Sequence, residues 1–356
     1  MEEKNKNKRK NIMFIVLSIL LLIGIGSFII FFLLGSKPIS NKKDTAKNNN
    51  KKNKEVVIKE KVDIIDTNSK TRPIAVSINN TPVAIPGQTG LNNAYLIYEI
   101  PTEGYTSRLL AFYKDVPNTK VGTIRSARHN FIDFAYESDA VLVAYGWSHY
   151  AEDELTSNVI NYVEGVVGEG RMYRDNPLGL AYEHTVYGET DAIKEYAYST
   201  KGYNRESDNT ILLNYNVSDT DLSTHDNKII ANKVTVNYGD VDTVFIYDNE
   251  KKMYNRNVNG VERKDMATGE TFNTKNIIIH KISYQMCDDN HYWCLNTTGS
   301  GEGYYITNGY AVPIKWSKDS RNSKTKYSYI NGEEISVSDG RTYIEVQIYQ
   351  KDTIIE

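Results

Sequence analysis

The chain has 356 residues, which is enough for two ordinary domains and a tail. Lysine and arginine number 42 and aspartate and glutamate 45, so the net charge of −3 excludes no class of partner by itself. The basic residues are concentrated in residues 1–61, and the remainder is distinctly acidic. An acidic body argues against nucleic-acid binding, because nucleic-acid-binding proteins carry a basic face.

Residues 12–34 form an uncharged and predominantly apolar run. As a helix this run would be about 34 Å long, against a hydrocarbon core of about 30 Å. No small-x-small cleavage pattern follows it, and no cysteine stands there to receive a lipid, so we predict a transmembrane anchor. The basic residues within 1–11 favour a cytoplasmic N-terminus and an extracellular body on a single-pass membrane protein.

Residues 35–66 are expected to form a flexible stalk, because their Lys- and Asn-rich composition offers too little apolar surface for folding. Residues 67–205 alternate short apolar runs with helical patterns, which is typical of a mixed α/β sandwich. Strands are predicted at residues 74–78, 94–100, 107–113, 121–124 and 140–144, and helices at residues 130–136, 150–163 and 190–199.

Residues 206–356 have a different sequence pattern, in which polar and apolar residues alternate in short runs. Asn-Gly pairs at residues 259–260, 308–309 and 331–332 stand between such runs and predict hairpin turns. Strands are predicted at residues 233–237, 243–247, 277–284, 303–307, 311–316 and 342–349. The predicted fold class is therefore α+β, with an N-terminal mixed α/β domain followed by an antiparallel β-rich C-terminal domain.

Cys287 and Cys294 are the only two cysteines of the chain. In an extracellular protein, a pair this close in sequence predicts a disulfide that closes a hairpin tip. The alternatives are two unrelated thiols or half of a metal site with His291. Further ligands at the spacing of a zinc site are not evident, so no metal and no cofactor is assigned from the sequence.

Residues 121–128 place Ser126 between Arg125 and Arg128, just ahead of an apolar segment. If a helix begins near Ser126, its first N–H groups and the two guanidinium groups suit an anion such as phosphate, sulfate or carboxylate. Surface ion pairing with nearby acids is the alternative interpretation. Arg108 and Arg174 complete the candidate ligand-binding residues.

The candidate catalytic residues are Glu99, Glu103 and His184. A glutamate whose pKa is raised by burial can act as the general acid of glycan cleavage, with a second carboxylate as its partner. The alternative for Glu99 is a structural pair with Arg108 that ties neighbouring strands. Ser126 and His184 would suit a nucleophile–base pair, but the sequence shows neither a nucleophile elbow nor an evident orienting acid.

With these motifs the chain resembles the YerB-like family of bacterial envelope proteins, a family of unknown function. The resemblance runs from Arg72 to about Gln347 and implies an envelope location and a two-part architecture without an established activity. Family members are often lipoproteins, and many carry proline at the position of Thr123. The matching pieces are Arg72-Pro, Asn80-Thr-Pro, Gln88-Thr-Gly-Leu91, Ile97-Tyr-Glu99, Glu103-Gly, Thr106-Ser-Arg108, Val121-Gly-Thr-Ile-Arg-Ser-Ala-Arg128, Tyr173-Arg-Asp175, His184-Thr-Val-Tyr187, Thr307-Asn-Gly309 and Trp316-Ser-Lys318.

Two functions remain open on these residues. The first is a non-catalytic envelope module whose arginine-lined cleft holds an anionic cell-wall polymer or the acidic segment of a partner protein. The second is a cell-surface hydrolase or lyase that acts on a glycan or phosphate-containing polymer, with Glu99 or Glu103 as acid/base. We favour the binding module. Both interpretations predict one surface cleft, formed by Arg125, Ser126 and Arg128 together with Glu99, Arg108 and His184.

Overall fold

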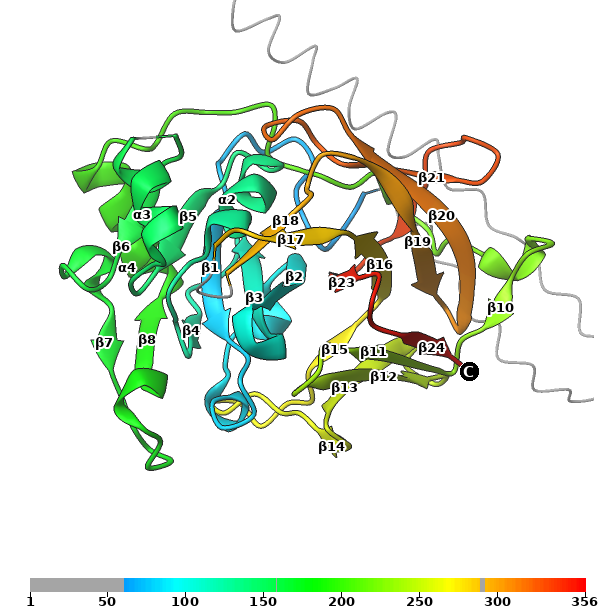
Figure 1. Cartoon of the computed structure of the whole chain (residues 1–356), viewed down its shortest axis with the longest axis horizontal. Coiled ribbons are helices and arrows are strands. Elements are labelled where there is room, and N and C mark those ends of the chain that lie inside the picture. The colour runs from blue at the N-terminus through cyan, green and yellow to red at the C-terminus, as the bar shows by residue number, and fades with distance from the viewer. Residues whose placement is uncertain (1–60, 158, 289–291) are drawn as a thin grey trace, which may run out of the picture. The chain divides into compact units, whose positions relative to one another are not determined.

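The computed structural model describes residues 61–157, 159–288 and 292–356. The predicted tail (1–11), the predicted transmembrane run (12–34) and most of the predicted stalk (35–66) lie outside these ranges. Within the described residues, no helix is both long and apolar enough to cross a bilayer. All of the described residues belong to one compact unit, shown in Figure 1.

One large sheet runs through this unit (Figure 1). The spatial order is β10 (Ile229–Ile230), β20 (Tyr310–Lys318), β19 (Gly299–Thr307), β16 (Asn276–Ile282), β23 (Thr342–Ile348), β2 (Leu96–Thr102), β3 (Thr106–Tyr113), β1 (Ile74–Asn79), β5 (Val141–Ala144) and β6 (Tyr162–Glu164), and β21 (Lys326–Tyr329) pairs with β20. Parallel pairing joins β1, β5 and β6, and also β2, β23 and β16, whereas the other neighbours are antiparallel. Because β2 lies beside β23, the sheet is continuous across residue 205, where the sequence predicts a change of domain.

Helices and a short hairpin cover one face of the large sheet, and further strands cover the other. The first cover consists of α2 (His129–Tyr136), α3 (His149–Thr156) and the hairpin of β17 (Tyr284–Met286) with β18 (Trp293–Leu295). The second contains the sheet β14 (Val261–Glu262), β13 (Met253–Val258), β12 (Asp242–Asp248), β11 (Lys233–Asn237) and β24 (Thr353–Ile355), with β15 (Asn273–Thr274) paired to β13. It also contains β4 (Lys120–Gly122), β8 (Val186–Glu189), β7 (Tyr173–Arg174) and α4 (Thr190–Glu195). A parallel pair, β22 (Val337–Ser338) with β9 (Tyr215–Asn216), completes the strands.

The central strands are buried on both faces, which explains their nearly continuous apolar sequences. On the helical face, Phe134 of α2 packs against Tyr98 of β2, with ring centroids 4.8 Å apart. On the opposite face, Phe245 of β12 packs against Tyr343 of β23 at 5.4 Å. Two apolar cores, one on each side of the large sheet, therefore hold the layers together.

The prediction of a mixed α/β fold with extensive antiparallel sheet is confirmed. The predicted strands are present, although their ends differ by a few residues. The predicted helix at residues 150–163 is wrong beyond Thr156, where α3 ends. Its last residues, Tyr162 and Val163, instead pair in parallel with Leu142 and Val143 of β5, so a long-range pairing overrides the local helical pattern.

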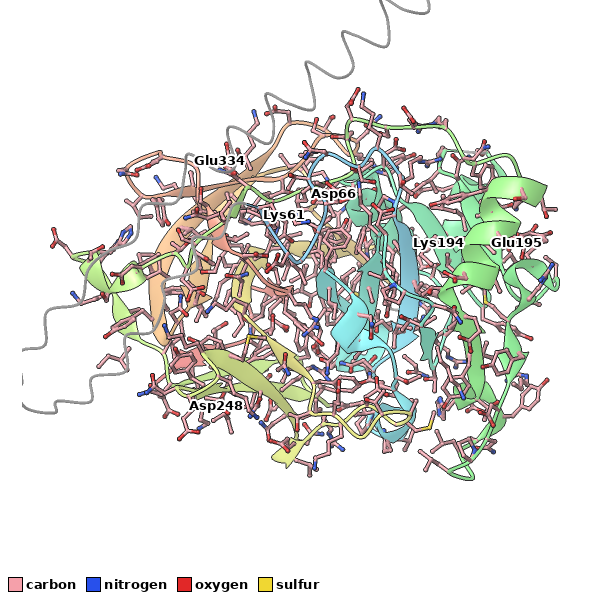
Figure 2. The ribbon with its side chains drawn as sticks, turned by 180° about the vertical axis from the view of Figure 1, so that it is seen from behind. Lys61, Asp66, Lys194, Glu195, Asp248 and Glu334 are labelled. Carbon is pink, nitrogen blue, oxygen red and sulfur yellow. A yellow bond between two sulfur atoms is a disulfide. The ribbon has the colours of Figure 1, made fainter. Side chains whose placement is uncertain are left out.

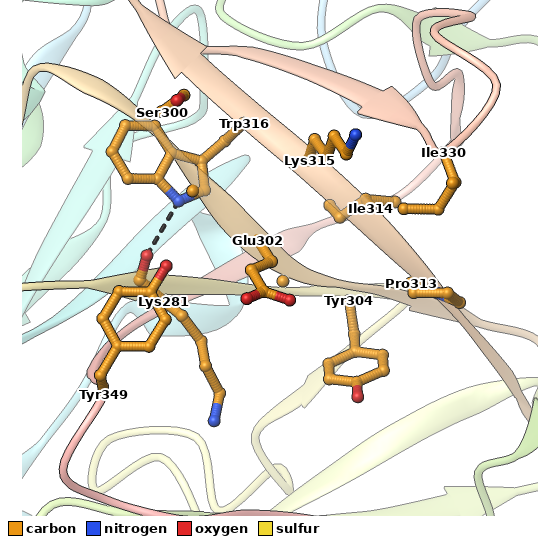
Figure 3. Close-up of a pocket in the computed structure, with 12 residues that line it drawn as sticks. Lys281, Ser300, Glu302, Tyr304, Pro313, Ile314, Lys315, Trp316, Ile330 and Tyr349 are labelled. Carbon is orange, nitrogen blue, oxygen red and sulfur yellow. Dashed lines mark hydrogen bonds between the residues drawn. The ribbon is translucent and has the colours of Figure 1, made fainter.

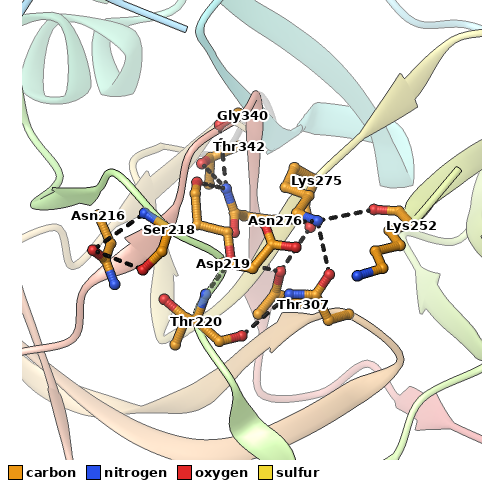
Figure 4. Close-up of polar contacts among 12 residues, drawn as sticks. Asn216, Ser218, Asp219, Thr220, Lys252, Lys275, Asn276, Thr307, Gly340 and Thr342 are labelled. Atoms are coloured by element: carbon orange, nitrogen blue, oxygen red, sulfur yellow. Dashed lines mark hydrogen bonds and ion pairs between the residues drawn. The ribbon is translucent and has the colours of Figure 1, made fainter. Parts of the chain in front are cut away.

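Two polar clusters fix the chain segments that lead into the sheet. The carboxylate of Asp339 accepts hydrogen bonds from the amides of Asp63 and Ile64 at 2.7 and 3.0 Å. The segment from Lys61 to Asp66 (Figure 2) therefore belongs to the folded body, and the prediction that it is part of the stalk is wrong. In the second cluster, Lys275 Nζ lies 3.0 Å from the carboxylate of Asp219 (Figure 4). These contacts hold two otherwise irregular segments against the connections that precede β23 and β16.

Candidate anion-binding site

The loop at residues 123–128 lies between the carboxyl ends of the parallel strands β1 and β5. The amide of Arg125 donates to the carbonyl of Ser77 at 2.9 Å, and the amide of Tyr145 donates to the carbonyl of Arg125 at 3.2 Å. The loop therefore fills the space where the two strands separate. In α/β sheets, the carboxyl edge of parallel strands is where ligands commonly bind.

The helix predicted to begin near Ser126 begins at His129, so Ser126 lies in the loop before it. The amide of Ala127 donates to the carbonyl of Gly146 at 2.9 Å, and this long-range bond holds the loop away from a helical conformation. The hydroxyl of Ser126 donates to the carbonyl of Tyr145 at 3.3 Å. The predicted use of Ser126 at a helix N-terminus is therefore wrong.

Arg125 and Arg174 have no ion-pair partner among the described residues. The Nη1 of Arg125 donates one long hydrogen bond, of 3.4 Å, to the carbonyl of Glu183. The guanidinium of Arg174 donates to the carbonyl of Tyr182 and lies 3.4 Å from the centroid of that ring, with the ring of Tyr145 at 5.1 Å. Stacking between aromatic rings fixes the guanidinium plane without neutralising its charge.

Arg128 and Arg108 are more tightly held. The Nε of Arg128 lies 2.9 Å from both carboxylate oxygens of Glu103, and its Nη2 contacts the same group. Although burial alone would raise it, the hydrogen bond and charge of Arg128 lower the pKa of Glu103. Arg108 is buried and donates to the carbonyl of Ser126. Burial and the charge of Arg128 lower the pKa of Arg108 to about 9, so it stays cationic at neutral pH.

We call Arg108, Arg125, Arg128 and Arg174 the arginine cluster. Burial lowers the pKa of Arg125. The charge of Glu183 opposes this effect, and the charges of Arg128 and Arg174 add to it. The charge of Glu103 acts on Arg108 and Arg128, and that of Glu183 acts on Arg125, so two carboxylates oppose the four guanidinium groups. The cluster therefore keeps an excess of positive charge on a body that is otherwise acidic, and such a concentration of one sign attracts anions.

His184 lies beside the arginine cluster in a 3₁₀ turn, Tyr182–His184. The Nδ2 of Asn79 donates to the Nδ1 of His184 at 2.8 Å, so the proton of the neutral imidazole is on Nε2. This Nε2 lies 3.9 Å from the carboxylate of Glu183. Burial lowers the pKa of His184. The charge of Glu183 opposes this effect, and the charge of Arg125 adds to it. His184 and Ser126 thus have separate partners and do not form the nucleophile–base pair considered from the sequence.

Glu99 lies apart from the arginine cluster, fully buried between the large sheet and the sheet that contains β12 and β13. The Nη2 of Arg256, on β13, pairs with its carboxylate at 3.2 Å. The prediction that Glu99 shares a surface cleft with Arg125 is therefore wrong, and so is its predicted pairing with Arg108. Further hydrogen bonds to the Glu99 carboxylate come from Asn80, Ser107 and Thr243.

Glu345 lies opposite Glu99 in the parallel register of β23 and β2. Sequence reasoning missed this residue and Arg256, although Glu345 shares with Glu99 the signal of a lone carboxylate in an apolar strand. Burial and the charge of Glu99 raise the pKa of Glu345 well above its usual value. Burial beside Glu99 therefore favours the protonated form of Glu345, and its Oε2 accepts a hydrogen bond of 2.9 Å from the hydroxyl of Tyr238.

We expect Glu345→Gln to be more stable than the wild type at pH 8 and to lose this advantage below about pH 4.5. Folding raises the pKa of Glu345 above 4.5, its value in the unfolded chain. The stability that the protonated Glu345 contributes is therefore fully present below pH 4.5 and is lost as the pH rises through the pKa of the folded protein. Glutamine reproduces the protonated carboxyl without that loss. Urea unfolding at several pH values measures the difference, and an advantage that grows as the pH falls would contradict the assignment.

A hollow of about 670 Å³ lies over β19 and β20, away from the predicted site residues (Figure 3). Tyr304, Tyr349, Glu302 and Lys281 are among the side chains that line it. Trp316 is 4% exposed, and its indole Nε1 donates to the carbonyl of Lys281 at 2.9 Å, so this ring packs in the protein interior and offers little surface to a ligand. The hollow is therefore a surface distinct from the arginine cluster.

These features define a two-part mixed α/β protein with a cationic cluster on its N-terminal part. Residues 62–204 match "Protein of unknown function (DUF3048) N-terminal domain", and residues 234–344 match the corresponding C-terminal domain. The chain belongs to this YerB-like DUF3048 family, as the sequence motifs predicted. The whole arginine cluster lies within the N-terminal match.

A protein of Bacillus subtilis (strain 168) named "Putative lipoprotein YerB" is 28% identical over 277 residues, which cover 77% of this chain and 78% of the relative. The crystal structure of YerB from Bacillus subtilis matches with a TM-score of 0.67 and 27% identity, and covers 78% of this chain and 91% of that chain. These descriptions name no ligand and no reaction, so the function has to be argued from the site.

Proposed function

We propose that this protein is a non-catalytic binding module of the bacterial cell envelope whose arginine cluster holds an anionic cell-wall polymer. The observation that carries the proposal is that Arg125 and Arg174 have no ion-pair partner among the described residues, and that only the charge of Glu183 partly offsets that of Arg125. Charges of one sign on neighbouring side chains repel one another, and a bound anion relieves this repulsion.

The chemistry of the cluster fits a phosphodiester-linked polymer. Each phosphodiester carries two non-bridging oxygens, which match the two-pronged geometry of a guanidinium group. Arg174 is held in a fixed plane by its stacking on Tyr182, and that ring is itself 71% exposed. The exposed ring offers an apolar face to the sugar or glycerol units between successive phosphates.

The geometry gives the alternative, a hydrolase that uses Glu99 or Glu103, less support. Glu99 has no exposed surface and cannot contact a polymeric substrate in this conformation. Glu103 is bound by Arg128, and its lowered pKa is the reverse of what a general acid requires. We therefore assign the two carboxylates to holding the fold and the arginine cluster in place.

The envelope location is part of the same proposal. It is supported by the relative named as a lipoprotein and by the apolar run at residues 12–34. Both cysteines of this sequence are joined in the disulfide Cys287–Cys294, so neither is available to carry a lipid. We therefore place a helical anchor at residues 12–34, with residues 1–11 in the cytoplasm and the body outside the cell.

Arg125→Ala is expected to weaken binding of poly(glycerol phosphate) by about ten-fold or more, because a hydrogen bond to a charged group contributes about 1.5–3 kcal/mol. Arg125→Lys should restore only part of the affinity, since an ammonium group cannot make the two-pronged contact. Isothermal titration calorimetry on the full-length chain in detergent measures both effects. Arg205→Ala is the matched control, because Arg205 is exposed and pairs with Asp139 outside the cluster.

Equal losses of affinity in Arg125→Ala and Arg205→Ala would contradict the proposal, because the polymer would then sense only net charge. Thermal melting of the same samples supplies the second readout. The side chain of Arg125 makes a single long hydrogen bond within the described residues, so its alanine variant should melt within a few degrees of the wild type. An Arg125→Ala variant that unfolds would assign this residue to the scaffold.

A further inference from the structure

A histidine contacts both sulfur atoms of the disulfide hairpin. Cys287 and Cys294 are bonded, with Cα atoms 5.2 Å apart, which confirms the disulfide predicted from the sequence. The Nε2 of His129, the first residue of α2, lies 3.5 Å from Sγ of Cys287 and 3.6 Å from Sγ of Cys294. The three ligand-capable atoms all lie within 4.8 Å of one another.

The hairpin is fastened to α2 by contacts that do not involve the sulfur–sulfur bond. The Nδ2 of Asn130 donates to the carbonyl of Trp293 at 2.6 Å, and its Oδ1 accepts from the amide of Leu295 at 3.1 Å. Trp293 and Leu295 flank Cys294 in β18. Because Asn130 bonds to both of them, Cys294 is held close to His129, the neighbour of Asn130 in α2.

The other cysteine is held by the hairpin itself. The amide of Cys287 donates to the carbonyl of Tyr292 at 2.9 Å, and Gln285 pairs with Cys294 in the register of β17 and β18. Opening the disulfide therefore leaves both sulfurs beside the imidazole of His129. A site that is assembled before the metal arrives binds it without the entropy loss of ordering the chain.

We propose that the reduced form of this group is a zinc site, with the thiolates of Cys287 and Cys294 and the Nε2 of His129 as ligands. Tetrahedral zinc with a Zn–S bond of about 2.3 Å and a Zn–N bond of about 2.0–2.1 Å separates a sulfur and a nitrogen ligand by about 3.6 Å. The two observed nitrogen–sulfur distances, 3.5 and 3.6 Å, already have this value. Only the two sulfurs have to move apart.

The site forms in two balanced steps. A dithiol reductant supplies two electrons and two protons, which cleave the sulfur–sulfur bond into two thiols while the reductant becomes a disulfide. Zinc then displaces one proton from each thiol and takes the lone pair of the neutral imidazole. Three protein ligands leave the fourth position of the metal for a water molecule or a ligand. This inference is independent of the proposed polymer binding.

The test uses the full-length chain without a polyhistidine tag, in detergent, in its oxidised and reduced forms. The reduced wild type should bind one Co²⁺ with thiolate-to-metal charge-transfer absorption, and Zn²⁺ should displace it, whereas the oxidised chain should show neither signal. Cys294→Ser should abolish the absorption. His129→Ala should weaken zinc binding by at least about ten-fold, because even changes outside the ligand shell commonly have effects of that size.

His149→Ala is the matched control for the histidine. The His149 side chain is 52% exposed, and its ring lies 5.2 Å from that of Tyr292 in the same hairpin. Its replacement should leave zinc affinity unchanged. Equal losses in the two histidine variants would overturn the proposal, and so would a reduced wild type that binds no more zinc than the oxidised one. Loss of the circular dichroism spectrum on reduction would also overturn it, because the geometry has to survive opening of the bond.

Discussion

Arg256→Ala is expected to destabilise the protein by about 3–5 kcal/mol, because it leaves the buried carboxylate of Glu99 without a counter-charge. Both side chains are fully buried, and the Nη2 of Arg256 lies 3.2 Å from Glu99 Oε2. The same guanidinium donates to the side-chain oxygen of Asn80 at 3.0 Å. Equilibrium unfolding in urea, followed by circular dichroism, measures the loss.

The control for this variant is an ion pair of similar length on the surface. Lys233 lies 2.8 Å from the carboxylate of Glu356, and the two side chains are 49% and 58% exposed. Solvent screening limits such a pair to about 0–1 kcal/mol, so Lys233→Ala should change the unfolding free energy only slightly. Losses of similar size in the Arg256 and Lys233 variants would contradict the interpretation of Glu99 as a buried, charge-paired group.

Lys318→Ala is expected to have an effect of similar size, about 3–5 kcal/mol, at a second buried ion pair. The Nζ of Lys318, at the end of β20, lies 2.7 Å from Glu137 Oε1, and both side chains are essentially without exposure. The Nζ also donates to the carbonyl of Asp133 at 2.9 Å. Its removal leaves a buried carboxylate and a buried carbonyl without their shared donor.

Two comparisons isolate the charge of Lys318. Lys318→Met keeps most of the side-chain volume, so it separates the loss of the ammonium group from the creation of a cavity. Lys315→Ala, on the same strand, removes an exposed lysine and should stay within about 0.5 kcal/mol of the wild type. A Lys318→Met variant as stable as the wild type in urea would show that Glu137 does not depend on the ammonium group.

Local patterns predicted most of the strands, because side-chain alternation and turn chemistry are readable within a few residues. The turn at Asn308-Gly309 is an example, since both residues adopt positive φ between β19 and β20. Strand order was beyond the sequence. The parallel pairing of β2 with β23 joins residues such as Glu99 and Glu345 from opposite ends of the folded chain, and no local pattern records that choice.

The candidate site was predicted in part. Arg108, Arg125, Arg128 and Arg174 do lie close enough for their charges to act on one another. Arg108 stands near the start of β3 in the large sheet, Arg125 and Arg128 follow β4, and Arg174 ends β7 in the three-stranded sheet. Glu99 was recognised as unusual, but its partner Arg256 is 157 residues away in sequence and belongs to another sheet. His129 was missed because it contacts sulfurs in a hairpin 158 and 165 residues later.

The central claim is that the arginine cluster, and not the net charge of the protein, binds an anionic wall polymer. The most direct test compares the affinity of poly(glycerol phosphate) for two charge-matched double variants, Arg125→Ala/Arg174→Ala and Arg205→Ala/Lys233→Ala. We predict a loss of about 100-fold or more for the first variant, since two charge-assisted contacts are removed, and an affinity near that of the wild type for the second. Equal affinities for the two double variants would contradict the claim.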